Sequence, residues 1–219
     1  LSFAVHDYFR NEGFYHVHTP IITGSDAEGA GEIFRVSTLD PKQTPLNKAG
    51  DTDFTKDFFG KETNLTVSGQ LEAETYAMGL GKVYTFGPTF RAENSNTSRH
   101  LAEFWMIEPE VAFYQLDQNM DLAEDFIKYV LQYVVDNCKN DLAFLDHRLS
   151  NEEKTKPQME RRPMGLLEQI RFVVDNQFVR LSYTEAFDIL RNSKPNKKKK
   201  FKFPVDEWGV DLQSEHERF

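Results

Sequence analysis

The sequence contains a single cysteine, Cys138, among 219 residues. An internal disulfide is therefore excluded, and so little cysteine fits a reducing compartment. Long apolar runs are also lacking, because no segment approaches the ~18–20 apolar residues that a helix needs to span a bilayer. The first residues, LSFAVHDYFRNEGF, do not have the layout of a signal peptide. Together these absences predict a soluble, cytoplasmic protein.

Several motifs that carry chemistry are absent as well. The chain has no GxxxxGK[ST] phosphate loop, no GxGxxG after a strand and no Cys/His pair with zinc spacing. No serine or cysteine stands in a recognisable nucleophile motif, which disfavours an enzyme with a covalent intermediate. His16 and His18 alternate on one predicted strand, but no third ligand lies nearby in the sequence, which disfavours a metal site.

Apolar residues and charge are unevenly distributed along the chain. The sequence is 39% hydrophobic with 19 Phe, enough for one sizeable core or one large domain with an appendage. A net charge of -9 argues against bulk electrostatic binding of nucleic acid. Positive charge is concentrated in SKPNKKKKFKFP, which carries six lysines from Lys194 to Lys202. This run is either a solvated loop or a contact for a nucleic-acid backbone.

Hydrophobic periodicity separates the helices from the strands. Helices are predicted at residues 1–12 (ending at Gly13), 70–80, about 121–149, 165–178 and 183–192. Strands are predicted at residues 14–20, 32–38, 63–69, 82–87, 89–93 and 101–113, with Pro88 separating the fourth strand from the fifth. Helices in separate blocks between hairpin strands predict an α+β fold with a mostly antiparallel sheet.

The predicted hairpin FRAENSNTSRHLAEFWMIEPE, residues 90–110, carries more charge than strand interiors usually do. Under period-two alternation Arg91 shares a face with Glu93 on one strand, and Phe104 shares a face with Glu108 on the other. If these faces coincide, a guanidinium for phosphate, a ring for stacking and carboxylates for an amine lie together. The hairpin is then a nucleotide site without a phosphate loop; the alternative is a structural salt-bridge hairpin.

The same hairpin resembles motif 2 of class II aminoacyl-tRNA synthetases, with the pattern FRxE, a loop, then R/H and F. The spacing of Arg91, His100 and Phe104 matches the aspartyl, asparaginyl and lysyl subgroup. FRNEGFYHVHTP resembles motif 1, with Pro20 as its terminal proline. Further blocks, such as TGSDAEGAGEIFRVST and DFFGKETNLTVSGQLEAETYA, are similar to asparaginyl members of the subgroup. The resemblance covers nearly the whole chain.

The resemblance implies ATP-dependent activation of L-asparagine, transfer to tRNA(Asn), use of Mg²⁺ and a homodimer formed through motif 1, which includes Pro20. It assigns Arg91 to catalysis at the α-phosphate. For ATP binding it implies Arg91, Glu93, Arg99, His100 and Phe104. For amino-acid binding it implies Ser25, Glu28, Gln70, Glu74 and Glu108, where Glu108 is either an ammonium neighbour or a core-edge ion pair.

The segment SGQLEAET is expected to choose the amino acid. Similar aspartyl enzymes carry a lysine three residues after the glutamine, where this chain has Ala73 followed by Glu74. A carboxylate accepts from the amide NH₂ of asparagine and repels the carboxylate of aspartate. An ordinary surface glutamate is the alternative for Glu74.

The resemblance also predicts what the chain lacks. The glycine-rich motif 3 and the magnesium ligands are expected beyond Phe219, and the N-terminal OB-fold is expected before Leu1. Residues 1–219 are therefore expected to be a partial catalytic domain, inactive alone, with a helical insertion at roughly 119–200. The rival functions are an aspartyl-tRNA synthetase, a synthetase-like ligase that makes free asparagine, and a non-catalytic paralogue.

Overall fold

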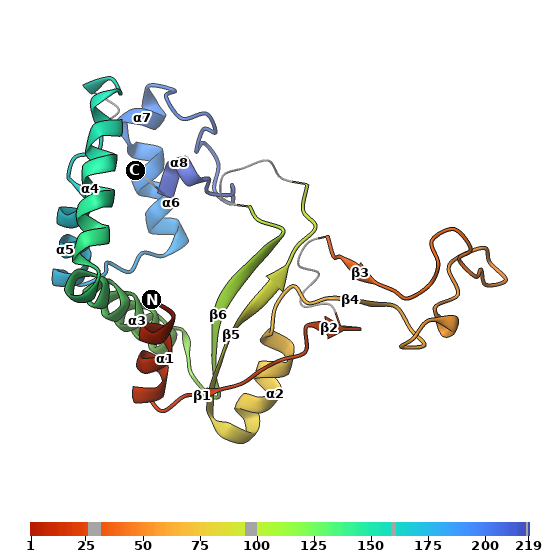
Figure 1. The fold of residues 1–219 in the computed structure, drawn as a ribbon. Helices are drawn as coiled ribbons and strands as arrows, with labels where there is room; N and C mark the ends of the chain where they lie inside the picture. The colour runs from red at the N-terminus through yellow and green to blue at the C-terminus, as the bar shows by residue number, and fades with distance from the viewer. Residues whose placement is uncertain (26–31, 95–99, 159–160, 218) are drawn as a thin grey trace. The chain divides into compact units, whose positions relative to one another are not determined.

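The computed structural model describes residues 1–25, 32–94, 100–158, 161–217 and 219 (Figure 1). The chain divides into two compact units, Leu1–Arg161 and Arg162–Phe219. The division falls inside the segment for which a helical insertion was predicted. None of the helices in the described part of the chain has the length and apolar character needed to cross a membrane.

The first unit contains two small sheets with the strand orders β1–β5–β6 and β2–β4–β3 (Figure 1). Its elements are α1 (Ser2–Asn11), β1 (Tyr15–His16), β2 (Ile22–Thr23), β3 (Arg35–Val36), the short 3₁₀ helix η1 (Phe54–Lys56), β4 (Thr63–Leu65), α2 (Gln70–Leu80), β5 (Lys82–Phe90), β6 (Glu103–Val111), α3 (Leu116–Asn137) and α4 (Lys139–Lys154). Strand β1 pairs with β5 in parallel, and the other pairs of these described strands are antiparallel. The arrangement agrees with the predicted α+β class.

Helix α1 ends where the sequence predicts. Gly13 has φ = 80°, a left-handed conformation that glycine adopts without steric cost. Its N–H donates to the carbonyl of Arg10 at 3.1 Å, and the N–H of Phe14 donates to the carbonyl of Phe9 at 2.9 Å. The rings of Phe9 and Phe14 then pack with centroids 5.1 Å apart. This is the hydrogen-bond pattern of a glycine-terminated helix with its hydrophobic contact.

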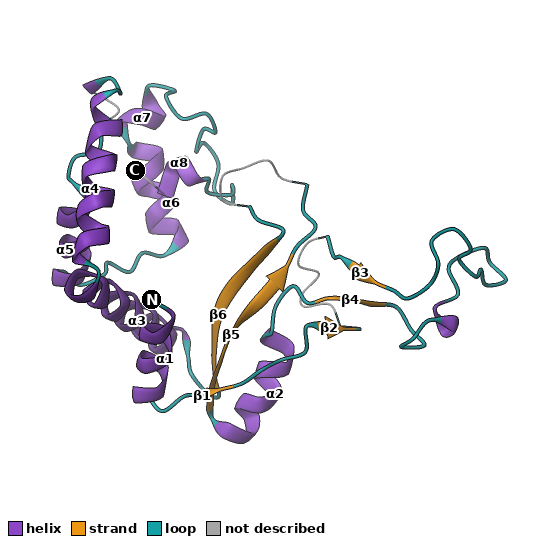
Figure 2. Ribbon diagram, in the orientation of Figure 1, coloured by secondary structure: helices purple, strands orange, loops and turns teal. Residues whose placement is uncertain are grey.

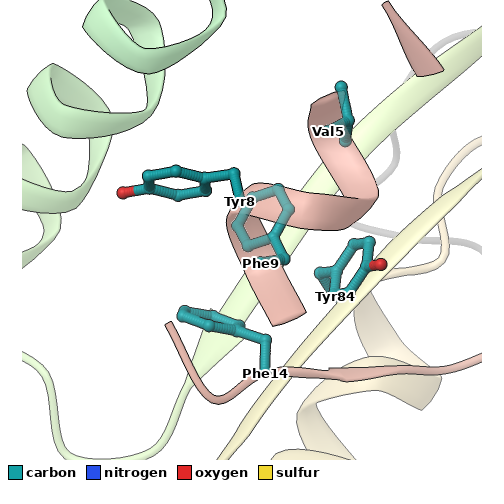
Figure 3. Packing of buried hydrophobic residues seen from close by; sticks show 5 residues of the cluster. All are labelled: Val5, Tyr8, Phe9, Phe14 and Tyr84. Atoms are coloured by element: carbon teal, nitrogen blue, oxygen red, sulfur yellow. The ribbon is translucent and has the colours of Figure 1, made fainter. Parts of the chain in front are cut away.

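The main core lies where α1 packs on the sheet. Val5, Tyr8, Phe9, Phe14 and Tyr84 are buried together, and Figure 3 shows their side chains converging between α1 and β5. Phe9 is fully buried and stacks on Tyr84 with ring centroids 4.4 Å apart. Partly buried side chains of α3 close the cluster: Leu122, Phe126 and Tyr129.

The opposite face of the sheet is covered by α2. Alternation along β5 directs Val83 away from its neighbour Tyr84, and Val83 packs with Ala73 and Ala77 of α2. All three of these small side chains are almost completely buried. One face of β5 is therefore covered by α1 together with α3, and the other face is covered by α2.

Strand β5 runs without interruption through Pro88, so the prediction that Pro88 separates two strands is wrong. Pro88 stands opposite Trp105 in the β5–β6 ladder. Two residues later, the N–H of Phe90 donates to the carbonyl of Thr66 at 2.9 Å, away from β6. By alternation the nitrogen of Pro88 also faces away from β6, so the missing N–H removes no bond from this ladder.

Two other boundaries differ from the predictions. The helix predicted at about 121–149 is two helices, α3 and α4, which meet at Cys138. Helix α4 extends to Lys154, beyond the predicted end of the single helix. The strands predicted at 14–20, 32–38 and 63–69 shorten to β1, β3 and β4, which have only two or three residues each.

The second unit is helical (Figure 2). Its elements are α5 (Leu166–Asp175), α6 (Tyr183–Asn192), α7 (Lys194–Lys197) and α8 (Ser214–Glu217). Ser182 caps α6, because its hydroxyl accepts from the N–H of Glu185 while the Glu185 carboxylate accepts from the N–H of Ser182. Phe187, Leu190 and Val205 form the small core of this unit.

Candidate functional site

The β5–β6 register brings the predicted site residues onto one face of the sheet. Thr85 stands opposite Glu108, and Thr89 stands opposite Phe104. Arg91 follows Thr89 by two residues and so lies on the same face. Phe104, Met106 and Glu108 therefore share their face with Arg91, as the hairpin interpretation required.

Arg91 is a half-buried cation that has no counter-ion among the described residues. Its Nη2 lies 3.4 Å from the carbonyl of Val67 and 3.8 Å from Sδ of Met106, and its Cζ lies 5.6 Å from the centroid of the Phe104 ring. Within the described part of the chain, Nε is buried without a hydrogen-bond partner and no carboxylate forms an ion pair with the side chain. A guanidinium that has only neutral neighbours and an unused donor can accept an anion such as a phosphate.

The open end of the hairpin pairs an acid with a base. His100 Nε2 lies 3.7 Å from Glu93 Oε2, and both side chains are partly exposed. Arg99, which was predicted to contact the same ligand, lies outside the described residues. The structure thus brings Glu93 and His100 together next to the Arg91 and Phe104 face.

Glu108 is held by three donors that lie on two other elements. The hydroxyl of Ser68 donates to Oε1, while Oε2 accepts from the N–H of Gly69 at 3.2 Å and from the Thr85 hydroxyl at 2.9 Å. Among the described residues no cation pairs with this carboxylate, so they form no core-edge ion pair with it. The bonds from Ser68 and Gly69 fasten β6 to the turn that precedes α2, and the bond from Thr85 joins β6 to β5.

Sequence reasoning missed Ser68, Gly69 and Thr85. A Cβ on Gly69 would lie 2.7 Å from Oγ1 of Thr19 and 3.0 Å from Cγ2 of Thr85, so only glycine fits at this close approach. The Ser68 hydroxyl also accepts from the N–H of Gln70 at 3.1 Å, which orders the start of α2. A serine and glycine directly before a helix were the available signal, but their partner is forty residues away in the sequence.

A small cavity of about 70 Å³ adjoins this cluster. Its lining includes His18, Thr19, Thr66, Gly69, Thr85 and Glu108. Hydroxyls and a carboxylate that line a concave space are the polar groups that fix the orientation of a small ligand.

On α2, Gln70 and Glu74 face the same way while Ala73 does not. Gln70 Nε2 donates to Glu74 Oε1 at 2.9 Å, as expected for side chains four residues apart. The Glu74 side chain is exposed, whereas Ala73 is completely buried against β5. Only Glu74 of these two neighbours is therefore available to a ligand.

The remaining predicted residues lie elsewhere in the first unit. The N–H of Ser25 donates to the hydroxyl of Thr23 at 3.0 Å, directly after β2. Glu28 lies outside the described residues, and Pro20 is exposed between β1 and β2.

No metal centre is assembled by the described residues: they contain no group of three His, Cys, Asp or Glu side chains arranged to hold an ion. The rings of His16 and His18 lie 4.5 Å apart, and His6 adds a third ring 4.9 Å from His16. Burial, followed by the nearby imidazoles, lowers the pKa of His16 below its usual value. His6 and His16 pack against the Tyr84 ring, with centroids 5.9 and 4.8 Å from it.

Comparisons with known proteins agree along the whole chain. The family model for class II tRNA synthetases (D, K and N) matches residues 1–219. Among curated relatives, an asparagine–tRNA ligase of Cytophaga hutchinsonii is 60% identical over all 219 residues, and one of Clostridium botulinum is 55% identical over 218 residues. The chain spans 43% of the length of each of these relatives.

Solved structures include a similar fold. An asparaginyl-tRNA synthetase of Pyrococcus horikoshii, complexed with asparaginyl-adenylate, superposes with a TM-score of 0.71 at 28% sequence identity. The match covers 99% of this chain and 39% of that protein.

Proposed function

Because the chain belongs to the class II tRNA synthetases of the D, K and N group over its full length, we propose that its protein activates asparagine with ATP and charges tRNA(Asn). The observation that carries this proposal is Arg91, a half-buried guanidinium with no described counter-ion, set beside Phe104 on one sheet face. The 60% identity to an asparagine–tRNA ligase supports asparagine as the amino acid.

The proposed reaction has two steps. An oxygen of the asparagine carboxylate attacks the α-phosphorus of ATP and pyrophosphate leaves; a ribose hydroxyl of the tRNA end then attacks the asparaginyl carbonyl and AMP leaves. Both are displacements between substrates, so the protein contributes position and charge rather than a nucleophile. Mg²⁺, when bound, would add positive charge at the phosphates; its ligands are proposed to lie outside the described residues.

Different residues of this sheet face and of the adjoining hairpin loop would contact different parts of ATP. Arg91 would bind the α-phosphate, where negative charge grows in the transition state, and its unused Nε and fork of donors suit that oxygen geometry. Phe104 would stack on the adenine ring, and Glu93 would accept from the adenine amine. His100 and Arg99 would contact the outer phosphates, with Glu93 releasing His100 from their 3.7 Å pairing.

The amino acid would lie beside the start of α2, next to the small cavity lined by Gly69, Thr85 and Glu108. Gln70 would bind the α-ammonium with Ser25 and Glu28, and Glu74 would accept from the side-chain amide. Glu108 acts differently under this proposal, because its carboxylate is engaged by Ser68, Gly69 and Thr85. It is a positioning residue that holds the start of α2 against β6.

The domain organisation follows from the same family relationship. We propose that residues 1–219 form part of the catalytic domain, since the chain spans 43% of the curated relatives. Helices α3 to α7 are proposed to include the insertion at roughly 119–200. The single thiol of Cys138 is in keeping with a cytoplasmic location.

Substitution of Glu74 by lysine tests the choice of amino acid. We expect kcat/KM for asparagine to fall by roughly 10- to 100-fold, because a hydrogen bond to a charged acceptor is lost and a cation faces the amide NH₂. The KM for ATP should change little. The measurement is ATP–pyrophosphate exchange by the full-length protein with asparagine or aspartate as substrate.

The control is Glu72→Lys, which makes the same charge change on the same helix but away from the Gln70–Glu74 face. Exchange by the unmodified protein with asparagine, and not with aspartate, supports the proposed function. Preference for aspartate would assign an aspartyl enzyme instead. Equal losses for both amino acids in Glu74→Lys would refute the role of Glu74.

We also propose that the protein is a homodimer, with α1 and the segment before Pro20 at the interface. In α1 the Phe3 side chain is 81% exposed, and in the adjoining β1 the Tyr15 side chain is 57% exposed. Large apolar side chains exposed on neighbouring elements are typical of an interaction surface. The substitution Phe3→Asp should therefore give a monomer by light scattering at micromolar concentration.

The matched control is Phe144→Asp on α4, where the side chain is 66% exposed and no interface is proposed. This variant should remain dimeric. A monomeric unmodified protein, or a dimer that survives Phe3→Asp, would contradict the proposed interface.

A further inference from the structure

The second unit carries a concentrated positive segment, residues 194–203, which we call the lysine turn. It contains Lys194, Lys197–Lys200 and Lys202 and no carboxylate, in a chain whose net charge is -9. The side chains of all six lysines are on exposed residues. Five of them, Lys194 and Lys197–Lys200, form no ion pair with any residue that the structure places. Such a group of unneutralised ammonium ions is costly to gather unless an anion binds there.

The lysine turn is built on a fixed scaffold rather than on a loose loop. The Asn196 side chain forms two hydrogen bonds with the backbone of Val205: Nδ2 donates to its carbonyl and Oδ1 accepts from its N–H, both at 3.0 Å. The Ser193 hydroxyl accepts from the N–H of Asn196 at 3.3 Å. Val205 is itself fully buried in the core of the unit. The backbone that carries the lysines is therefore anchored at both ends.

A carboxylate also fastens the backbone of the lysine turn. Glu215 accepts from the backbone N–H of Lys202 at 3.0 Å and from that of Phe203 at 2.7 Å. These two backbone bonds, with a smaller contribution from the charge of Lys202, hold the pKa of Glu215 below its usual value. His216 completes the anchor, since its Nδ1 accepts from the N–H of Gln213 and its Nε2–H donates to the carbonyl of Phe203 at 2.8 Å.

Lys199 stands where a helix normally ends in glycine. Its φ is 52°, its N–H donates to the carbonyl of Asn196, and the N–H of Lys200 donates to the carbonyl of Pro195. This is the same pair of bonds that ends α1 at Gly13, but here a lysine adopts the left-handed conformation that disfavours residues with a Cβ. Lys199 therefore closes the turn that carries its neighbours Lys198 and Lys200.

An exposed aromatic ring accompanies the lysines. Phe203 is 47% exposed, and the Nζ of Lys202 lies 5.4 Å from its ring centroid. Cations for phosphates next to a flat ring for an unpaired base form the kind of surface that single-stranded nucleic acid binds.

We propose that the lysine turn binds the phosphodiester backbone of RNA, and that its RNA is the tRNA substrate. The identity of this RNA rests on the proposed function, whereas the phosphate chemistry rests on the lysine turn itself. Lys197, Lys198 and Lys200 contact phosphates, Lys199 sets the turn, and Phe203 lies beside the strand.

The test compares two triple variants of the full-length protein that remove equal charge. The first is K197Q/K198Q/K200Q, which leaves Lys199 and the scaffold intact. The control is K42Q/K48Q/K56Q, which neutralises three exposed lysines of the first unit. Affinity for tRNA(Asn) is measured across a series of KCl concentrations, and ATP–pyrophosphate exchange with asparagine is measured without tRNA.

For the first variant we expect the slope of log affinity against log salt to fall by about 2 to 3, since each lost phosphate contact removes about 0.7 to 0.9. The slope of the control variant should stay close to that of the unmodified protein, and pyrophosphate exchange should be unchanged in both. An unchanged slope with normal exchange overturns the lysine-turn proposal alone. Absence of exchange in the unmodified protein overturns the proposed function instead. If K197Q/K198Q/K200Q keeps the salt dependence of tRNA binding seen in the unmodified protein but no longer binds poly-glutamate, the lysine turn binds an acidic protein surface instead of RNA.

Discussion

Arg91→Ala should lower the rate of pyrophosphate exchange by about 100- to 1,000-fold, the usual loss when one preorganised donor is removed from a developing negative charge. The size of the effect follows from the setting of the guanidinium. Its neighbours among the described residues, the Val67 carbonyl and the Met106 sulfur, are neutral, so its charge would be available to the α-phosphate in the proposed reaction. Arg91→Lys should recover only part of the loss, because an ammonium cannot reproduce the fork of donors.

The control for Arg91 is Arg148→Ala on α4, which removes an exposed ion pair with Glu152. Such pairs contribute little, so exchange and stability should stay near those of the unmodified protein. Thermal unfolding of Arg91→Ala should also be almost unchanged. A large drop in its melting temperature, or exchange within a few-fold of normal, would show that Arg91 serves the fold and not the reaction.

Phe9→Ala should destabilise the first unit by about 3–5 kcal/mol, which is the range for removal of a buried phenylalanine. Phe9 is 0% exposed and its ring meets four others, on Tyr8, Phe14, Tyr84 and Phe126. The cavity cannot close easily, because these rings come from α1, the sheet and α3. Calorimetry should show a melting temperature lower by roughly 6–20 °C, at about 2–4 °C for each kcal/mol in a chain of this size.

Phe144→Ala provides the matched comparison, because that ring is 66% exposed on α4. Its removal should change the free energy of unfolding by no more than about 0.5 kcal/mol. A Phe9→Ala variant that melts within 2 °C of the unmodified protein would contradict the assignment of this cluster as the main core.

The sequence predicted helices better than strands, for a physical reason. Helix α2 spans the residues that helix propensity predicts, because helical bonds join residues only four apart and local composition decides whether they form. A strand depends on a partner that its own sequence does not specify. Strand β1 is only two residues long because β5 pairs with it at just two positions, and Pro88 is tolerated in β5 because no bond to β6 requires its nitrogen. The break at Cys138 was hidden because apolar periodicity continues on both sides of it.

The candidate site was also predictable only in part. Alternation along each strand predicted that Phe104 and Glu108 share one face of their strand and gave the face of Arg91 on the other. The β5–β6 register then showed that these two faces coincide. Ser68 and Thr85 were missed because their link is Glu108, which is 40 and 23 residues away along the chain. Ala73 is the opposite case. It stands where similar aspartyl enzymes carry a lysine that meets the substrate, which suggested a position close to the substrate. Its side chain is instead completely buried between α2 and β5.

The three hydrogen bonds to Glu108 have a consequence for the entropy of the proposed reaction. Two of them join β6, which carries Phe104, to the turn that begins the helix proposed for the amino acid, and the third joins β6 to β5. The separation between the attacking carboxylate and the α-phosphorus is then largely set when the chain folds, before either substrate arrives. Orientational freedom that two free molecules would lose on reacting is instead lost once, during folding. The hydrogen bonds of Glu108, which link the proposed nucleotide and amino-acid parts of the site, would thereby raise the reaction rate without contacting a reacting atom.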